Sequence, residues 1–558
     1  MASPPLPSAL DANTQTFPTL SAAQISRVRA AGKVRPVAHG EILFEPGQTN
    51  ISFYVLLSGA MEIVQPGIDG ERQVAKHDPG EFTGELNMVS GRRSLVLGRI
   101  TKPGEIIELS TEQFRGLISR DAELSDVFMR AFILRRLILI QKGLGNLVLL
   151  GSQHSAQTLR LREFLTRNTQ PFVYMDLDLD SDAQDLLDRF QVRTDEIPVI
   201  ICGVRGAVLR NPTIQKLADC LGMNAAIDES QVRDIVIVGA GPAGLAAAVY
   251  AASEGLDALV IETAAPGGQA GSSSKIENYL GFPMGISGQE LAARAIAQAA
   301  KFGAHMMVAH SVSRLDCDRR PYKVVLDTGA AVSTRAVVIA TGAQYNKPHI
   351  ENLERFEGLG VYYGATNMES QLCKGEEVIV LGGGNSAGQA AVFLAGAARR
   401  VHLVVRSGQL ADTMSRYLIQ RIEENPAIEL HYNTELVGLQ GEKQLECVQW
   451  RNKKSGETSV HKICHVFIMA GANPRTEWLQ GCLSLDPKGF ILTGRDLPGS
   501  NGSSPWKLKR PPQMLETSLP GVFAVGDVRS GNVKRVAAAV GEGAISIHMV
   551  HRCLAELD

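Results

Sequence analysis

The pattern of apolar and polar positions changes character along the chain. Residues 1–16 are rich in Pro, Ser and Ala and predict a disordered tail, whereas residues 17–145 begin with short apolar runs such as EILFEPG and FYVLLSGAMEIVQPG. Turn residues separate these runs at intervals of about 8–12 residues, which is typical of a β-barrel or jelly roll. Helical periodicity then extends from Glu112 to Gln141.

The next segment, residues 146–224, alternates apolar strands with helices. The strands are NLVLLG, PFVYMDLD and PVIIC, and the helix AQTLRLREFLTRN lies between the first two. A linker at residues 225–232 leads to residues 233–558, which contain two glycine-rich βαβ units. We therefore expect a multidomain chain in which a β domain with helices precedes two α/β regions.

The first unit reads DIVIVGAGPAGLAAA. Its strand runs into G-x-G-x-x-G, where Gly239 permits the tight turn, Gly241 lets a pyrophosphate approach the backbone and Gly244 lets helix and strand pack closely. The next strand, ALVIE, ends at Glu262, 23 residues after Gly239, where an acid binds a ribose 2′-hydroxyl. This unit predicts a dinucleotide site.

The second unit reads VIVLGGGNSAGQAAVFL and carries Gly382 and Gly384. Its second strand, VHLVV, ends at Arg406, 24 residues after Gly382. A cation in place of the acid favours a 2′-phosphate and hence NADPH over NADH, although an arginine merely exposed at a strand end is the alternative. Two dinucleotide folds in one chain indicate that one cofactor passes electrons to the other.

Composition and charge exclude several classes of protein. A chain of 558 residues is too long for one core, and 44% hydrophobic with 20% charged residues excludes a disordered or fibrous protein. The net charge of −2 gives no sign of a nucleic-acid partner. The chain shows no secretory signal, no apolar run fit to span a membrane and no metal-ligand motif.

The eight cysteines include no CxxC pair. Together with the lack of a secretory signal, this spacing predicts a cytoplasmic protein with mostly reduced, buried thiols.

Residues 233–558 resemble the low-molecular-weight thioredoxin reductase family of flavoproteins. The segments that carry the resemblance are GAGPAG at 239–244, PGGQ at 266–269, IENYLGFP at 276–283, VIATGA at 338–343, GGGNSA at 382–387 and GVFAVGD at 521–527. The resemblance implies an FAD domain formed by residues 233–346 and 471–558, an NADPH domain inserted at 347–470, and a homodimer.

The resemblance also assigns site residues. Those implied to contact FAD, with Asp527 on the ribityl chain, are Gly239, Gly241, Pro242, Ala243, Gly244, Glu262, Gly268, Gln269, Asn278, Ala340, Thr341, Gly342, Gly526, Asp527, Arg535 and Val536. Those implied to contact NADPH are Gly382, Gly384, Asn385, Ser386 and Arg406.

The chain departs from this family at the redox centre. The family carries a CATC-type pair 17 residues before the second glycine motif, and the same positions here are Ala365, Thr366, Asn367 and Met368. Without a dithiol the flavin cannot reduce thioredoxin by the usual exchange. The nearest thiol, Cys373, is interpreted as a small buried side chain, and its use with a distant thiol in a true thioredoxin reductase is the minor alternative.

The segment FTGELNMVSGRRSLV at 82–96 resembles the phosphate-binding cassette of cyclic-nucleotide-binding domains. The residues implied to bind a cyclic nucleotide are Gly84, Glu85, Leu86, Arg93 and Ser94. In that interpretation Glu85 accepts the ribose 2′-hydroxyl and Arg93 pairs with the phosphate. The alternative is a degenerate domain that serves only as an interaction module.

Residues 146–224 resemble a glutaredoxin-like domain of the thioredoxin fold. Ser152 and Ser155 occupy the strand-to-helix corner where that family keeps CxxC, and IPVI at 197–200 makes Pro198 a candidate cis residue. Serines cap a helix but perform no thiol chemistry, so we predict an adaptor without redox activity. The alternative is a surface that still docks thiol or glutathione-like ligands.

Together these features predict an NAD(P)H-dependent FAD oxidoreductase that acts without a CxxC pair. Its acceptor would be oxygen, a quinone-like molecule, a small disulfide or a redox protein. Regulation by a cyclic nucleotide would pass through the helix at residues 122–141. The alternative is a non-enzymatic redox sensor or scaffold that binds FAD and nucleotides.

Overall fold

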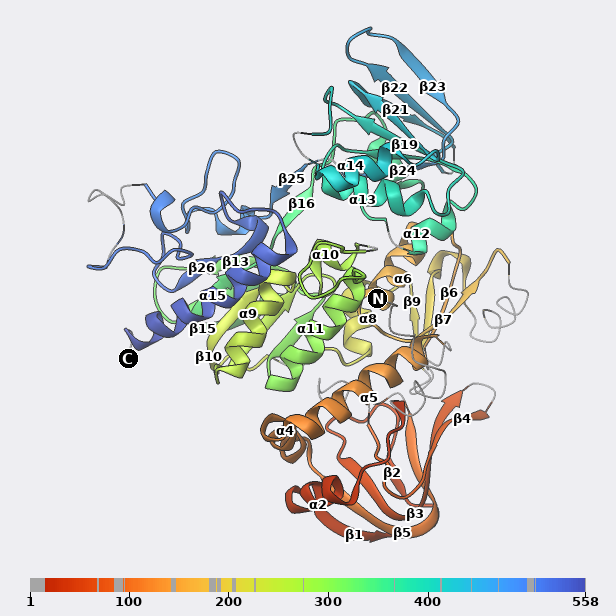
Figure 1. Cartoon of the computed structure of the whole chain (residues 1–558), viewed down its shortest axis with the longest axis vertical. Helices are drawn as coiled ribbons and strands as arrows, with labels where there is room; N and C mark the ends of the chain where they lie inside the picture. Colours follow the sequence, from red (N-terminus) through yellow and green to blue (C-terminus); the bar gives the residue numbers. More distant parts are fainter. Residues whose placement is uncertain are drawn as a thin grey trace, which may run out of the picture.

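The computed structural model describes the chain in segments. They are residues 16–67, 70–84, 94, 96–141, 147–179, 187, 192–202, 207–224, 227–273, 275–365, 367–411, 414–442, 444–469, 471–498, 506 and 508–556. Figure 1 shows the N-terminal domain at the bottom, the segment that begins with β6 to its right and above, and the two dinucleotide regions at the centre and the top.

The N-terminal domain is an antiparallel sheet with the order β1-β5-β3-β4, in which β2 also pairs with β5. Its elements are α2 (Ala22–Ala31), β1 (Lys33–Val37), β2 (Ile42–Phe44), β3 (Phe53–Gly67), β4 (Gly70–His77), β5 (Leu97–Leu109), α4 (Thr111–Arg120) and α5 (Ala122–Gln141). The stretch with helical periodicity, Glu112 to Gln141, is divided at Asp121, and α5 has the bounds expected for the helix at residues 122–141. The Asp121 carboxylate accepts a 3.0 Å hydrogen bond from the Leu124 backbone N–H, so Asp121 caps the start of α5.

A cluster of phenylalanines joins this sheet to its helices. The rings of Phe53 on β3, Phe114 on α4 and Phe128 on α5 lie within 5.6 Å of one another, measured between centroids. Ala300, from a distant helix, completes the same buried cluster. Helix α4 of the N-terminal domain therefore contacts the distant helix that carries Ala300.

The middle domain has a four-stranded sheet with the order β7-β6-β8-β9. Its elements are β6 (Leu147–Gly151), α6 (Ala156–Arg167), β7 (Val173–Asp176), η1 (Thr194–Glu196), β8 (Val199–Cys202), β9 (Ala207–Arg210) and α8 (Ile214–Cys220). Strands β6 and β7 are parallel, whereas β8 is antiparallel to both β6 and β9. The Ile197–Pro198 peptide bond is cis, as predicted.

The first dinucleotide region forms a sheet with the order β12-β11-β10-β15-β14-β13, and β26 adds to β15. Its elements are β10 (Val232–Val238), α9 (Pro242–Ser253), β11 (Ala258–Glu262), α10 (Gly268–Gly271), α11 (Gly288–Phe302), β12 (His305–Val308), β13 (Val312–Asp316), β14 (Tyr322–Leu326), β15 (Ala331–Ile339), η3 (Glu477–Leu479), η4 (Gly494–Asp496), β26 (Val522–Ala524), η5 (Gly526–Val528) and α15 (Val536–Ala555). Helix α15 packs on α9 so closely that a Cβ at Gly543 would lie 2.1 Å from the Ala243 carbonyl oxygen.

The second dinucleotide region is inserted into the first. The chain leaves through β16 (Ala343–Tyr345) and returns through β25 (Ala472–Pro474), which pair antiparallel. The inserted elements are η2 (Leu353–Phe356), β17 (Val361–Tyr362), α12 (Asn367–Leu372), β18 (Glu377–Leu381), α13 (Asn385–Leu394), β19 (Arg400–Val405), α14 (Arg416–Glu423), β20 (Ile428–Tyr432), β21 (Thr434–Gln440), β22 (Cys447–Asn452), β23 (Thr458–His461) and β24 (His465–Ile468). A parallel sheet, β17-β24-β18-β19-β20, is accompanied by the antiparallel sheet β21-β22-β23.

The cysteines depart from the expectation at one pair. Cys317, just after β13, and Cys482, just after η3, form a disulfide across 165 residues. The insertion separates the two in sequence while the fold brings them together, so spacing along the chain gives no sign of the pairing. Of the six free cysteines, Cys202, Cys373 and Cys553 are buried as expected, whereas Cys220, Cys447 and Cys464 are only partly buried.

None of the helices in the described part of the chain combines the length and the apolar composition that a membrane span requires.

Candidate functional site

The glycines of the first dinucleotide unit are imposed by close contacts. Gly239 follows β10 with a φ of +101°, and a Cβ there would lie 2.4 Å from the Ala340 carbonyl oxygen. A Cβ at Gly244 would lie 1.9 Å from the Gly239 carbonyl oxygen. Gly241 is the N-cap of α9, where a Cβ would come no nearer than 3.9 Å to Gly268, so room is left for a ligand beside the helix N-terminus.

A cavity of about 950 Å³ opens beside this unit. Glu262, at the end of β11, lines it, and its two carboxylate oxygens accept hydrogen bonds from the backbone N–H groups of Ala240 (2.8 Å) and Ala264 (3.0 Å). These bonds fix the carboxylate in the cavity wall while leaving further lone pairs for a ribose hydroxyl. The arrangement fits the role predicted for Glu262.

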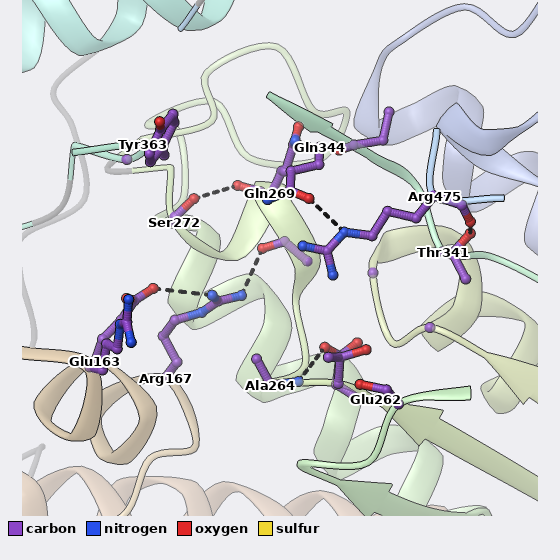
Figure 2. Close-up of a pocket in the computed structure, with 18 of the residues that line it drawn as sticks. Glu163, Arg167, Glu262, Ala264, Gln269, Ser272, Thr341, Gln344, Tyr363 and Arg475 are labelled. Atoms are coloured by element: carbon purple, nitrogen blue, oxygen red, sulfur yellow. Dashed lines mark hydrogen bonds and ion pairs between the residues drawn. The ribbon is translucent and has the colours of Figure 1, made fainter. Parts of the chain in front are cut away.

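Helix α6 of the middle domain forms another wall of this cavity. Arg160, Glu163 and Arg167 line it, and Figure 2 shows Arg167 extending from α6 toward the segment that carries Gln269. Its Nη2 donates to the carbonyl oxygens of Gly268 (3.0 Å) and Ala265 (3.4 Å). Sequence reasoning missed these residues, because nothing local marks a helix of another domain as part of a nucleotide site.

The return segment contributes residues that were also missed. The Arg475 guanidinium, just after β25, donates a 2.7 Å hydrogen bond to the Gln344 side chain (Figure 2), and Trp478 lines the same cavity. Gln344 directly follows the VIATGA segment, which was the one available signal.

A second cavity, of about 190 Å³, lies on the other side of Gly268. Both dinucleotide units line it: Gln269 and Asp527 come from the first, and Asn385 and Ser386 from the second. Burial raises the pKa of the Asp527 carboxyl, and the positive charge of Lys534 opposes that shift. Gln269 donates its amide hydrogen bond to the Ala343 carbonyl oxygen, at the start of β16.

The structure brings most of the predicted FAD residues to these two cavities. Those that line one or both are Gly239, Gly241, Pro242, Ala243, Glu262, Gly268, Gln269, Asn278, Ala340, Thr341, Gly526, Asp527, Arg535 and Val536. Gly244 and Gly342 line neither cavity. Gly244 lies behind the turn, where the lack of a side chain lets α9 pack against the Gly239 carbonyl oxygen.

The second unit places a helix N-terminus at the second cavity. Gly382 has a φ of +150°, and a Cβ there would lie 2.6 Å from the Met469 carbonyl oxygen. Gly384 is the N-cap of α13, and the Asn385 side chain accepts a 2.8 Å hydrogen bond from the Ser415 backbone N–H. Arg406 is exposed just beyond β19. Arg406, Gly382 and Gly384 line neither cavity.

The positions predicted to correspond to the family's redox pair hold no thiol. Ala365 is buried, Thr366 lies outside the described residues, and Asn367 and Met368 begin α12. Glu369, one turn further on, lines the first cavity.

Cys373 is fully buried. Its Sγ donates to the Ser370 carbonyl oxygen at 3.6 Å, and burial raises the pKa of the thiol to about 11. The thiol therefore stays protonated and inaccessible at neutral pH, which agrees with its interpretation as a packing residue.

In the N-terminal domain the predicted cassette is described only at its ends. Gly84 has a φ of +114°, and the buried Ser94 donates a 2.8 Å hydrogen bond to the Val96 carbonyl oxygen. Glu85, Leu86 and Arg93 lie outside the described residues.

Arg135 connects α5 to the start of this cassette. Its Nη1 donates to the carbonyl oxygens of Phe82 (3.1 Å) and Gly84 (3.0 Å), and its guanidinium lies 4.7 Å from the centre of the Phe82 ring. Burial lowers the pKa of the Arg135 guanidinium to about 9. A charged side chain is thus held between the helix and the loop.

Two models of known protein families match this sequence. The model of the pyridine nucleotide-disulphide oxidoreductase family matches residues 233–543, more than half of the chain. The chain belongs to this family. A second model, of the cyclic nucleotide-binding domain, matches residues 34–121.

Similar proteins include bacterial thioredoxin reductases. That of Streptomyces coelicolor is 34% identical over 316 residues, which cover 56% of this chain and 91% of the relative. That of Bacillus subtilis is 31% identical over 333 residues, covering 60% and 98%. Among solved structures, Lactococcus lactis thioredoxin reductase in its FR conformation superposes with a TM-score of 0.52 at 28% identity, covering 58% of this chain and 99% of that one.

These matches make the chain an NAD(P)H-dependent FAD oxidoreductase with an N-terminal cyclic nucleotide-binding domain. FAD and NADPH are the cofactors of this family, and the two cavities offer residues that fit them.

Proposed function

We propose that this oxidoreductase passes electrons from NADPH through FAD to an acceptor that reaches the flavin site without an intervening CxxC pair. The observation that carries this proposal is the second cavity, in which Asn385 and Ser386 of one unit face Gln269 and Asp527 of the other. The N-terminus of α13, which would hold the pyrophosphate of NADPH, thus lies at the same cavity as residues that would hold FAD.

The residues around the cavities have distinct roles in this proposal. FAD, when bound, supplies a carrier that accepts a hydride equivalent and releases the electrons to a second substrate. Glu262 would hold the adenosine ribose, and the N-terminus of α9 at Gly241 would hold the pyrophosphate. Asp527 would accept a hydrogen bond from a hydroxyl of the ribityl chain, and Arg406 would pair with the 2′-phosphate of NADPH.

The acceptor class follows from the missing dithiol. Ala365 and Met368 occupy the aligned positions, the sequence holds no CxxC, and Cys373 is buried. We therefore expect direct reduction of oxygen, a quinone-like molecule, a small disulfide or a redox protein, rather than exchange through an internal disulfide.

The N-terminal domain supplies regulation in this proposal. A cyclic nucleotide bound between Gly84 and Ser94 would act on α5 through Arg135, whose hydrogen bond to the Gly84 carbonyl oxygen ties helix to cassette. The middle domain, with its β7-β6-β8-β9 order and cis Pro198, would serve as a thioredoxin-like adaptor without redox activity. We further expect a homodimer that works in the cytoplasm.

An anaerobic titration tests this function. The FAD-loaded protein is mixed with NADPH, and separately with NADH, while the visible flavin band is recorded. Bleaching by NADPH at lower concentration than by NADH is the expected result. The titration is then repeated with cyclic AMP and with cyclic GMP. A flavin that stays oxidised under all of these conditions would overturn the proposal and favour a non-enzymatic sensor.

A further inference from the structure

Three histidines and two glutamates gather between the two sheets of the inserted region, away from both cavities. In the parallel pairing of β19 and β20, His402 lies opposite Glu429 and Val404 lies opposite His431, so these three polar side chains share one face. Trp450 on β22 covers them, with its ring centre 5.6 Å from that of His402 and 4.9 Å from that of His431. The His461 ring on β23 lies against Trp450, tilted by 31° with the ring centres 3.7 Å apart.

The ligand atoms of this cluster converge on one point. His402 Nδ1 lies 3.0 Å from His431 Nε2, and the Glu429 carboxylate oxygens lie 3.6 Å from His431 Nε2 and 3.9 Å from His402 Nδ1. All three groups offer an atom within 4.8 Å of the others. A tetrahedral ion with bonds of about 2.0–2.1 Å to nitrogen holds its ligands roughly 3.3 Å apart, so small movements suffice to seat one.

A carboxylate orients the first histidine from behind. Glu377 on β18 lies 3.3 Å from His402 Nε2, the ring nitrogen that faces away from His431. A proton on Nε2 directed at this carboxylate leaves the Nδ1 lone pair facing the cluster. This is the arrangement in which histidine ligands of metal ions are commonly held, with the second ring nitrogen donating to a carboxylate.

One oxygen of the Glu429 carboxylate is left available to an ion. Arg400 donates to Oε2 of Glu429 at 2.9 Å, so Oε1, the oxygen nearer to His431, keeps its lone pairs for an ion.

We propose that His402, His431 and Glu429 form a binding site for a divalent transition metal of the zinc class, with water as the fourth ligand. Two imidazoles and a carboxylate suit Zn²⁺ and, more loosely, Co²⁺ and Ni²⁺. Glu429 is 46% exposed on its side chain, which leaves a solvent path for the water and for the entering ion. The ion cross-links β19 to β20 four residues before Arg406.

The sequence carries no motif for such a site, because its ligands come from two parallel strands separated by a helix. The spacing of 402, 429 and 431 matches no local metal-binding pattern. Only the register of the two strands brings the ligands together.

Cobalt tests the site directly. FAD-loaded protein, freed of any affinity tag and treated with a chelator, is titrated with Co²⁺ while absorption is recorded at wavelengths beyond the flavin band. We expect a four-coordinate Co²⁺ band that saturates at a single equivalent and disappears when Zn²⁺ is added. H402Q and H431Q should each weaken Co²⁺ binding at least tenfold. H465Q, which alters a histidine of the same sheet that pairs with Glu376, is the matched control and should bind normally.

A second measurement covers variants that fold poorly. Zn²⁺ should raise the Tm of the chelator-treated wild-type protein and leave that of H431Q unchanged. Absence of the Co²⁺ band in the wild type, or equal Co²⁺ affinity in the wild type and both site variants, would overturn the proposal.

Discussion

Arg167 belongs to helix α6 of the middle domain, yet its Nη2 donates a 3.0 Å hydrogen bond to the carbonyl oxygen of Gly268 in the first dinucleotide region. Gly268 has a φ of +56° and lines both cavities. The middle domain thus supports the turn at Gly268 and forms part of the wall of the larger cavity.

Replacing Arg167 with alanine should weaken FAD retention. The change removes a charged donor from the Gly268 carbonyl oxygen, a loss of about 1.5–3 kcal/mol, which corresponds to a ten- to hundredfold weaker affinity. The increase in free-flavin fluorescence on dilution measures the loss of FAD affinity. Arg162→Ala is the matched control, because Arg162 lies on the same helix but stacks on Tyr174 within the middle domain at 4.2 Å. Equal FAD affinity in both variants would contradict this role.

Arg406→Gln should alter the choice between the two nicotinamide nucleotides. Loss of a charge-assisted hydrogen bond to a 2′-phosphate is worth about 1.5–3 kcal/mol, so the KM for NADPH should rise at least tenfold while that for NADH stays constant. Arg451→Gln provides the comparison, because Arg451 on β22 is paired with Glu435 on β21. A similar rise for both nucleotides would show that Arg406 acts on folding instead.

Cys373→Ala should leave the rate of flavin reduction and the turnover with any acceptor unchanged. The Cys373 thiol is fully buried and its pKa lies at about 11, so it neither attacks a disulfide nor leaves as a thiolate at neutral pH. A modest loss of stability, about 1 kcal/mol from the small cavity, should appear in thermal unfolding. A drop of tenfold or more in turnover with intact flavin reduction would restore Cys373 as a redox group.

Reduction of the Cys317–Cys482 disulfide should destabilise the first dinucleotide region. The bridge closes a loop of 165 residues and links β13 to η3, two segments that line the larger cavity. Bridges over long loops stabilise by about 2–4 kcal/mol, so dithiothreitol should lower the Tm by several degrees. The Cys317→Ser variant should start at the lower Tm and respond no further to reductant. A reductant effect of equal size in that variant would point to another thiol.

Arg135→Met should destabilise the N-terminal domain by about 3 kcal/mol. The substitution removes the hydrogen-bond donor of the Phe82 and Gly84 carbonyl oxygens, which then lose a partner at a site shielded from water. Hydrogen exchange should then quicken in α5 and around Gly84. Arg130→Met, which breaks an exposed pair with Asp126, should leave exchange at both places unchanged.

The sequence by itself determined the parts whose signals are local. The glycines of both dinucleotide units and the acid at Glu262 follow directly from short motifs, because a tight turn and a close approach to phosphate each require a particular residue at one position. The role of Arg406 stays a prediction, since this residue lines neither cavity. The cis bond before Pro198 was likewise readable from IPVI.

Only the tertiary structure decided what lies beside those motifs. Arg167 and Arg475 enter the larger cavity from a different domain and from the far side of an insertion, and Cys317 meets Cys482 for the same reason. His402, Glu429 and His431 meet through strand register alone. Such contacts depend on how whole layers pack, and packing is set by the sum of many apolar contacts rather than by any residue pattern near the groups that finally touch.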